Sequence, residues 1–162
     1  MTLTPFFTAD PIVQAHAGAA LLALCLGPFV IWRKRRDRLH RGLGRVWIVT
    51  MIVVASTSWF INDFALIGPF GPVHLFAVMT YWSLFVSIRH LRAGRYAKHG
   101  AEMRSLYVYA LGIAGAFTLL PGRTLHAVFF GESGVAPAGL VAILVVGLAW
   151  YDRRAGSVQI VR

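Results

Sequence analysis

The stretch RKRRDRLHRGLGR, residues 33–45, decides the fold, because it concentrates positive charge between two long apolar segments. Seven of the sixteen Lys and Arg residues lie in these thirteen positions, with His40 among them. Basic residues of this kind gather in the cytoplasmic loops that join membrane helices. The stretch therefore predicts a cytoplasmic loop, and it fixes the orientation of the apolar segments on both sides.

Composition places the chain in the membrane class. Of 162 residues, 57% are hydrophobic and 14% are charged, whereas a soluble domain carries roughly a quarter charged residues. The net charge of +10 lies beside the apolar runs, so topology explains it and no nucleic-acid partner is expected. The single cysteine, Cys25, lies inside an apolar run and excludes an intramolecular disulfide. The first eleven residues have no basic segment, so no removable signal peptide is expected.

The apolar runs predict one all-α integral membrane domain, a four-helix transmembrane bundle plus a fifth C-terminal span. Asp10 and Pro11 suit the cap and first turn of the first helix, and the second helix has a start before His40 as an alternative. The spans are expected at about residues 11–32, 44–67, 73–88, 98–120 and 135–151.

Charge gives the orientation of these spans. A second basic segment, residues 89–104, holds five Lys and Arg, the C-terminal tail holds three, and only Arg123 falls on the other side. This distribution predicts a multi-pass protein of the cytoplasmic membrane, with the N-terminus outside and the C-terminus in the cytoplasm. Trp32, Trp47, Trp59 and Trp150 are expected in the interfacial belts, and the deeper Trp82 in the core.

Six histidines form a pattern that suggests a chemistry. His16 and His74 are 58 residues apart at the predicted outer face, and His40 and His99 are 59 apart at the inner face. Two such pairs on facing helices are what two bis-histidine haem b sites require, because each haem iron takes two axial imidazoles. The alternative is that these imidazoles are solvated or meet lipid headgroups.

Cationic side chains near the pairs would neutralise the haem propionates. The candidates are Arg41, Arg45, Lys98 and Arg104 for the inner site and Arg123 for the outer site. His90, within a run of arginines, is interpreted as solvated. His126 is interpreted as a surface residue, with a spare ligand or a proton acceptor near a quinone as alternatives.

Four segments resemble a family of small bacterial predicted membrane proteins of unknown function with an H-R-x-L-G-R loop. They are AHAGAALLALCLGP with His16, LHRGLGRVW (39–47), KHGAEM (98–103) and FTLLPGR (117–123). The histidine pattern also resembles the transmembrane di-haem b-type cytochromes, and this resemblance implies His16 with His74 and His40 with His99 as metal ligands. The chain departs from those cytochromes in lacking a sixth helix and an ascorbate-site signature.

The leading hypothesis is a membrane b-type cytochrome, an electron-transfer oxidoreductase coupled to quinone or to a redox partner protein. The alternative is a non-catalytic accessory or assembly subunit of a larger membrane complex, in which the histidines are interfacial. A small transporter or metal carrier has less support. No catalytic residue is assigned, because no soluble-enzyme motif is present.

Overall fold

The computed structural model describes residues 3–61, 71–119, 124–130, 146–147 and 150, and every regular element among them is a helix. These elements are α1 (Thr4–Phe7), α2 (Pro11–Ile31), α3 (Arg38–Ser58), α4 (Pro72–Arg92), α5 (Tyr96–Ser105), η1 (Leu106–Gly112), α6 (Ile113–Phe117) and α7 (Thr124–Phe130). The η1 segment is π-helical and joins α5 to α6 in one continuous helix. The predicted all-α class holds for the described residues.

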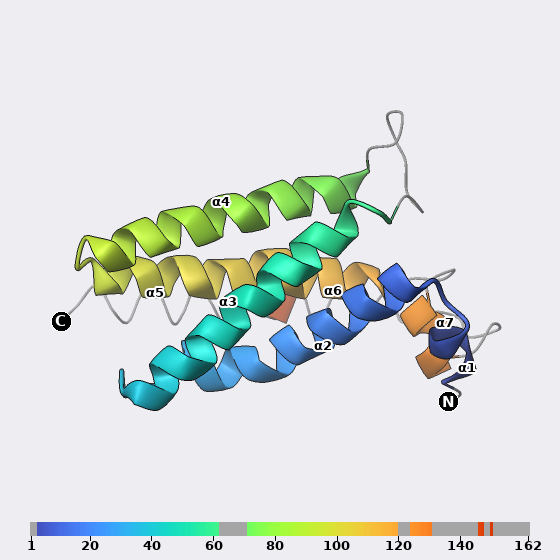
Figure 1. The fold of residues 1–162 in the computed structure, drawn as a ribbon, viewed down its shortest axis with the longest axis horizontal. Helices are drawn as coiled ribbons and strands as arrows, with labels where there is room; N and C mark the ends of the chain where they lie inside the picture. Colours follow the sequence, from blue (N-terminus) through green and yellow to red (C-terminus); the bar gives the residue numbers. More distant parts are fainter. Residues whose placement is uncertain (1–2, 62–70, 120–123, 131–145, 148–149, 151–162) are drawn as a thin grey trace.

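The long helices lie side by side and alternate in direction (Figure 1). α2 packs on α3, α3 on α4, and α4 on α5, while η1 returns to touch α2. The C-terminal end of α2, the start of α3, the end of α4 and the start of α5 therefore share one end of the bundle (Figure 1). Short helices α1 and α7 contact each other at the opposite end.

The helix boundaries follow from local capping. Asp10 accepts a hydrogen bond from the Ile12 backbone N–H at 2.8 Å, which confirms the predicted start of the first helix. Asp37 accepts from the His40 N–H at 2.9 Å, so α3 begins at Arg38 rather than near residue 44. Gly94, with a φ of +70°, closes α4 in a Schellman arrangement and turns the chain into α5. Of the predicted fifth span, only Val146, Gly147 and Trp150 are described, as helical residues.

Two helices, Pro11–Ile31 and Arg38–Ser58, are long and apolar enough to cross a bilayer. In their most apolar windows only 11% and 22% of the residues are buried inside the protein. The central helix of a soluble protein would be mostly buried, so these apolar faces are suited to lipid. The described residues support a membrane protein, and the five-span topology stays a prediction.

Polar side chains tie the neighbouring helices together. His16 bonds to α3, Ser56 on α3 bonds to Tyr81 on α4, and Ser87 on α4 bonds to His99 on α5. Trp47 Nε1 donates to the Ala23 carbonyl of α2 at 2.9 Å. Such hydrogen bonds hold membrane helices in register, because lipid offers no alternative partner.

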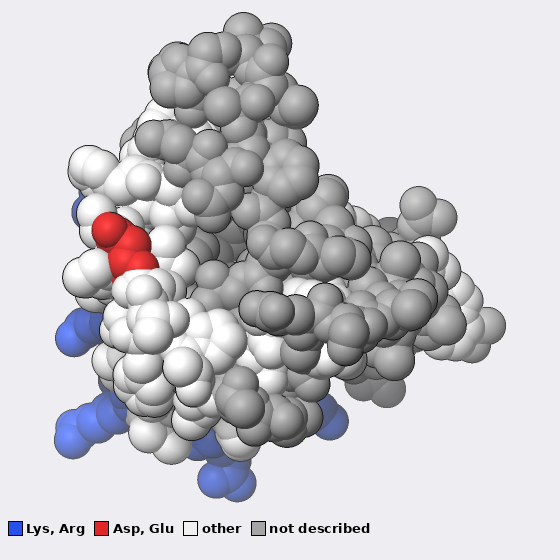
Figure 2. All heavy atoms as spheres, turned by 90° about the vertical axis from the view of Figure 1, so that its right-hand side faces the viewer, with Lys and Arg blue, Asp and Glu red and all other residues white. Residues whose placement is uncertain are grey.

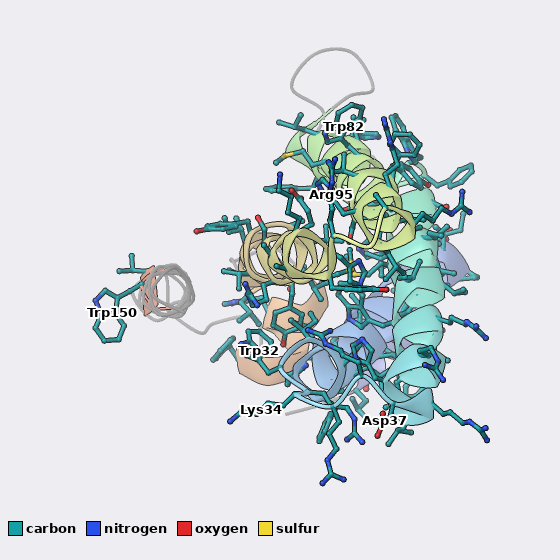
Figure 3. The ribbon with its side chains drawn as sticks, turned by 90° about the vertical axis from the view of Figure 1, so that its left-hand side faces the viewer. Trp32, Lys34, Asp37, Trp82, Arg95 and Trp150 are labelled. Atoms are coloured by element: carbon teal, nitrogen blue, oxygen red, sulfur yellow. The ribbon has the colours of Figure 1, made fainter. Side chains whose placement is uncertain are left out.

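Two predictions about tryptophans were wrong. Trp47 is 1% exposed and belongs to the core instead of an interfacial belt, since its indole N–H has a carbonyl partner on α2. Trp82 is 67% exposed and lies on the outer side of α4, where an indole can face lipid (Figure 3). The amphipathic character of an indole does not reveal which face of a helix carries it.

Pro28 leaves a gap in the hydrogen bonds of α2 that η1 fills. In a helix the N–H of residue 28 would bond to the Leu24 carbonyl, but proline has no N–H. Tyr107, from η1, donates its hydroxyl to that carbonyl at 3.1 Å. Gly27 permits this approach, because a Cβ at that position would overlap the Tyr107 ring. The π-helical turn and the proline thus meet at one contact.

Candidate functional site

A small pocket, with a cavity volume of about 40 Å³, lies at the end of the bundle where the basic connections gather. Its walls come from the end of α2, the start of α3 and the start of α5. The lining comprises Val30, Ile31, Arg36, His40, Gly44, Trp47, Ile48, His99, Gly100 and Met103. His40 and His99, predicted as a pair from their spacing, therefore line the same pocket.

The tautomer of His99 is set by α4. Its Nδ1 lies 2.7 Å from the Ser87 hydroxyl oxygen and 3.2 Å from the Ser87 carbonyl oxygen. A carbonyl can only accept, so Nδ1 carries the proton and the lone pair of the neutral ring is on Nε2. Ser87 is fully buried and also donates to the His99 carbonyl at 3.3 Å. A histidine whose Nδ1–H is held by a carbonyl is oriented as metal-binding histidines are.

The hydrogen bonds of the His40 ring are less complete than those of His99. Its Nε2 accepts from Arg36 Nη1 at 3.2 Å. Its Nδ1 is buried and faces the Val30 backbone without a hydrogen bond of good geometry. A buried polar nitrogen without a partner is disfavoured by about 1–3 kcal/mol, so the imidazole would be stabilised by a group that binds it. In this pocket the lone pair of His40 Nε2 is therefore held by Arg36, whereas the described contacts of His99 involve its Nδ1 and leave its Nε2 lone pair available.

The predicted outer pair is arranged differently. His16 Nδ1 lies 3.1 Å from the Val54 carbonyl and 2.9 Å from the Thr57 hydroxyl on α3, so its Nε2 holds the lone pair. His74, 6% exposed, accepts the Gly71 N–H on Nδ1 at 3.1 Å. In neutral His74 the proton is then on Nε2. Both histidines lie against the C-terminal end of α3, His16 through its hydrogen bonds and His74 through an edge-on ring contact with Trp59 at 5.3 Å between centroids.

The next residues to place are the cationic side chains that were predicted to neutralise the haem propionates. Arg41, Arg45 and Lys98 are exposed and are not part of the pocket lining. Arg104 is half-buried and its Nη1 would lie 4.0 Å from a Cβ built on Gly100, in the pocket wall. Arg123 lies outside the described residues.

Two other histidines complete the set. His90 is half-buried near the end of α4. His126 is 4% exposed and its Nδ1 donates to the Leu119 carbonyl at 3.0 Å, so its interpretation as a surface residue was wrong. The seven residues of α7, TLHAVFF, are too few for their periodicity to show which side of the helix is buried.

Positive charge surrounds the pocket end. All twelve described Lys and Arg residues lie on the α2–α3 and α4–α5 connections or on the adjoining parts of α3, α4 and α5. Lys34 and Arg95 mark these two connections in Figure 3, which faces this end. Viewed from the opposite end, Lys and Arg stand at the margin and the central described atoms are uncharged (Figure 2).

Asp37 is an acidic residue at this basic end. It forms an ion pair with Arg33 at 2.6 Å. The Arg33 guanidinium and the His40 backbone N–H hold the pKa of the Asp37 carboxyl well below its usual range. Asp37 therefore stays ionised at physiological pH, and it caps α3 just before the turn that carries His40.

Two residues of the site were missed from the sequence. Arg36 was counted only as one of many loop cations, and its contact with His40 became visible once α3 was found to start at Arg38. Ser87 carried one usable signal, since it is a hydroxyl two residues before the basic end of α4. Periodicity alone could not place it opposite His99.

Comparison with known proteins gives one match. Residues 13–154 match a family described as "Predicted membrane protein (DUF2306)". No curated protein and no solved structure matches the chain.

Proposed function

The chain belongs to the DUF2306 family of predicted membrane proteins. We propose that it binds haem between His40 and His99 and transfers electrons in the membrane. The observation that supports this most is the His40–His99 pocket. Two imidazoles from different helices line it, and His99 has its Nδ1–H on a carbonyl and its Nε2 lone pair available. Haem would supply a one-electron redox couple at this end of the bundle.

The number of available ligands favours haem over a bare metal ion. Among the described residues no group of three or more His, Cys, Asp or Glu side chains comes together. A zinc ion usually takes three or four protein ligands, whereas a porphyrin supplies its own equatorial nitrogens and requires only axial ligands. Two histidines are sufficient for the second case.

The protein residues have separate roles at the site. Ser87 holds the His99 ring in its orientation, and Met103 with Ile48 supplies an apolar wall that excludes water. Burial of this kind and nearby positive charge both tune a redox potential. Quinone or a redox partner protein is the proposed electron partner.

The outer histidines support a second haem less well. His74 would have to release the Gly71 N–H, or move its proton, before Nε2 could bind a metal. His16 has its Nδ1–H on the Val54 carbonyl, as His99 has on Ser87, so His74 is the weaker member of the outer pair. We therefore propose that the inner site fills first, with one haem per chain.

The test is the absorption spectrum of the full chain, expressed with adequate haem and purified in detergent. We expect Soret and α bands in the dithionite-reduced minus oxidised spectrum, at about one haem per chain. His99→Ala should abolish these bands, while His90→Ala, a histidine at the same end of the bundle outside the pocket lining, should keep them. A colourless wild-type protein would refute the cytochrome proposal and favour the alternative, a non-catalytic accessory subunit of a larger membrane complex.

The proposed topology has four spans in the described bundle plus the fifth C-terminal segment, with the N-terminus outside. The charge asymmetry between the two ends of the bundle supports it. Reporter fusions after residues 35 and 94 should both be cytoplasmic, and a fusion after residue 61 should be on the opposite side. A cytoplasmic reporter after residue 61 would contradict this orientation.

A further inference from the structure

The pocket between His40 and His99 has room for a single ion and little else. Its cavity volume is about 40 Å³, and a cavity needs about 10–15 Å³ to hold one water molecule. A porphyrin ring fits between these imidazoles only after the surrounding helix ends move apart. The space between α2, α3 and α5 therefore matches an ion, and the side chains that line it decide which ion.

Both imidazoles have their lone pair on Nε2 and their Nδ1 turned to the backbone of a neighbouring helix. His99 Nδ1 lies 3.2 Å from the Ser87 carbonyl oxygen of α4. His40 Nδ1 faces the Val30 backbone of α2, and its Nε2 accepts from Arg36. The two rings are also close enough for positive charges on them to repel each other. Metal-binding histidines are oriented in this way, because the held N–H leaves the other nitrogen to the metal.

Met103 supplies a third donor atom. It follows His99 by about one turn of α5, so the two side chains lie on the same face of the helix, and both line the pocket. Met103 is 6% exposed, so its thioether is directed into the protein. None of the described lining residues is a cysteine or a carboxylate. The donor set is therefore two imidazoles and one thioether.

This donor set selects a soft monovalent ion. A thioether favours Cu(I), and imidazole suits copper as well as zinc. Zinc sites use Cys, His, Asp and Glu side chains, so Met103 adds nothing to a zinc site. The basic residues at this end also repel a divalent cation about twice as strongly as a monovalent one, because Coulomb energy scales with charge. Cu(I) satisfies both conditions.

We propose that the haem-free chain binds one Cu(I) ion through His40 Nε2, His99 Nε2 and the Met103 thioether. This inference goes beyond the proposed function and does not depend on haem binding. Arg36 and the metal compete for one lone pair, since its Nη1 donates to His40 Nε2 at 3.2 Å. Arg36 is exposed, so its guanidinium can turn to solvent when the ion enters. Copper and haem use the same imidazoles, so each excludes the other.

The test is an anaerobic titration of Cu(I) into the haem-free full chain in detergent, in competition with a chromophoric Cu(I) chelator and with ascorbate present. We expect one tightly bound ion per chain. Met103→Leu nearly conserves side-chain volume and should weaken binding by about tenfold or more, since even an outer-shell partner contributes that much. Met79→Leu is the matched control, because Met79 is 47% exposed on α4 and lies outside the pocket lining.

Four further measurements identify the ligands. His99→Ala should abolish stoichiometric binding, and His90→Ala should keep it. Arg36→Ala should tighten binding, because it removes a competing donor and a positive charge, a gain that a purely structural role would not produce. Cys25→Ser should bind as the wild type does, which excludes the exposed thiol as a ligand. X-ray absorption at the copper edge should show sulfur in the wild type and only lighter ligand atoms in Met103→Leu.

The outcomes separate this site from the haem proposal. An unchanged affinity in Met103→Leu, or loss of copper in Cys25→Ser, would overturn the three-ligand site. A chain that gives haem bands but binds no Cu(I) would refute the copper site alone. A chain that binds Cu(I) through these residues and gives no haem bands would refute the haem proposal alone.

Discussion

Tyr107→Phe is expected to destabilise the protein only while Pro28 is present. Pro28 cannot donate to the Leu24 carbonyl, and the Tyr107 hydroxyl donates to it instead at 3.1 Å. Phenylalanine keeps the ring, which packs edge-on against Trp32 with centroids 5.3 Å apart. The variant therefore removes one hydrogen bond and leaves the packing in place.

The magnitude follows from the surroundings of that carbonyl. Interhelical hydrogen bonds in membrane proteins contribute about 0.6 kcal/mol on average and up to about 1.7 kcal/mol. The Leu24 carbonyl has no helical donor and lies under a partly buried ring, so the upper half of this range applies. We expect a loss of about 1–1.7 kcal/mol in the free energy of unfolding.

Pro28→Ala restores the backbone N–H of residue 28 and gives the Leu24 carbonyl its ordinary helical partner. In that background Tyr107→Phe should have little effect, so the double-mutant cycle should give a coupling energy near 1 kcal/mol. Equilibrium unfolding in mixed micelles, followed by tryptophan fluorescence, measures all four proteins. Tyr109→Phe is the control, because Tyr109 lies in the same π-helical segment with no recorded hydrogen bond from its hydroxyl. Equal losses from Tyr107→Phe in both backgrounds would refute this account of the contact.

Three further predictions concern single positions. Gly27→Ala should destabilise by about 1–3 kcal/mol through overlap with a ring of η1, whereas Gly18→Ala, with open space at its Cβ, should stabilise by up to about 1 kcal/mol in the same unfolding assay. Ser87→Ala should weaken haem binding roughly tenfold in a titration, because His99 loses its hydroxyl partner, and an unchanged affinity would exclude this role. Asp37→Ala should lower the thermal midpoint at neutral pH. Because the folded-state pKa of Asp37 is depressed, its contribution is complete above about pH 4 and declines only as pH falls further, so the difference between the proteins should shrink at acid pH.

The sequence was sufficient to pair the inner histidines, His40 and His99, because the distribution of charge and the spacing along the chain indicate which helix ends lie together. The basic segments indicate which helix ends lie at the same membrane face. The spacing of 59 residues between His40 and His99 places these two histidines at equivalent positions of successive helical hairpins. The structure places His40 and His99 on one pocket accordingly. Metal binding at this pocket remains a prediction, and the second haem that the spacing suggested at the outer face is not part of the proposed function.

What the sequence could not provide is the rotation of each helix about its own axis. Trp47 and Trp82 were placed on the wrong faces, because both were assigned from their depth along the helix and not from the side of the helix that carries them. Ser87 and Tyr107 are similarly ambiguous until the neighbouring helix is in place. In a lipid environment the polar partner of a side chain identifies its face better than hydrophobicity does.

The proline contact and the pocket are mechanically linked through α2. Beyond Pro28, the last turn of α2 supplies Val30 and Ile31 to the pocket wall. Before it, the Ala23 carbonyl is held by Trp47, which lines the same pocket from α3. An α2 with a continuous set of backbone hydrogen bonds would carry this last turn at a different angle. The tyrosine of η1 therefore does more than satisfy one carbonyl, because it fixes the interrupted helix whose end closes the pocket against His40.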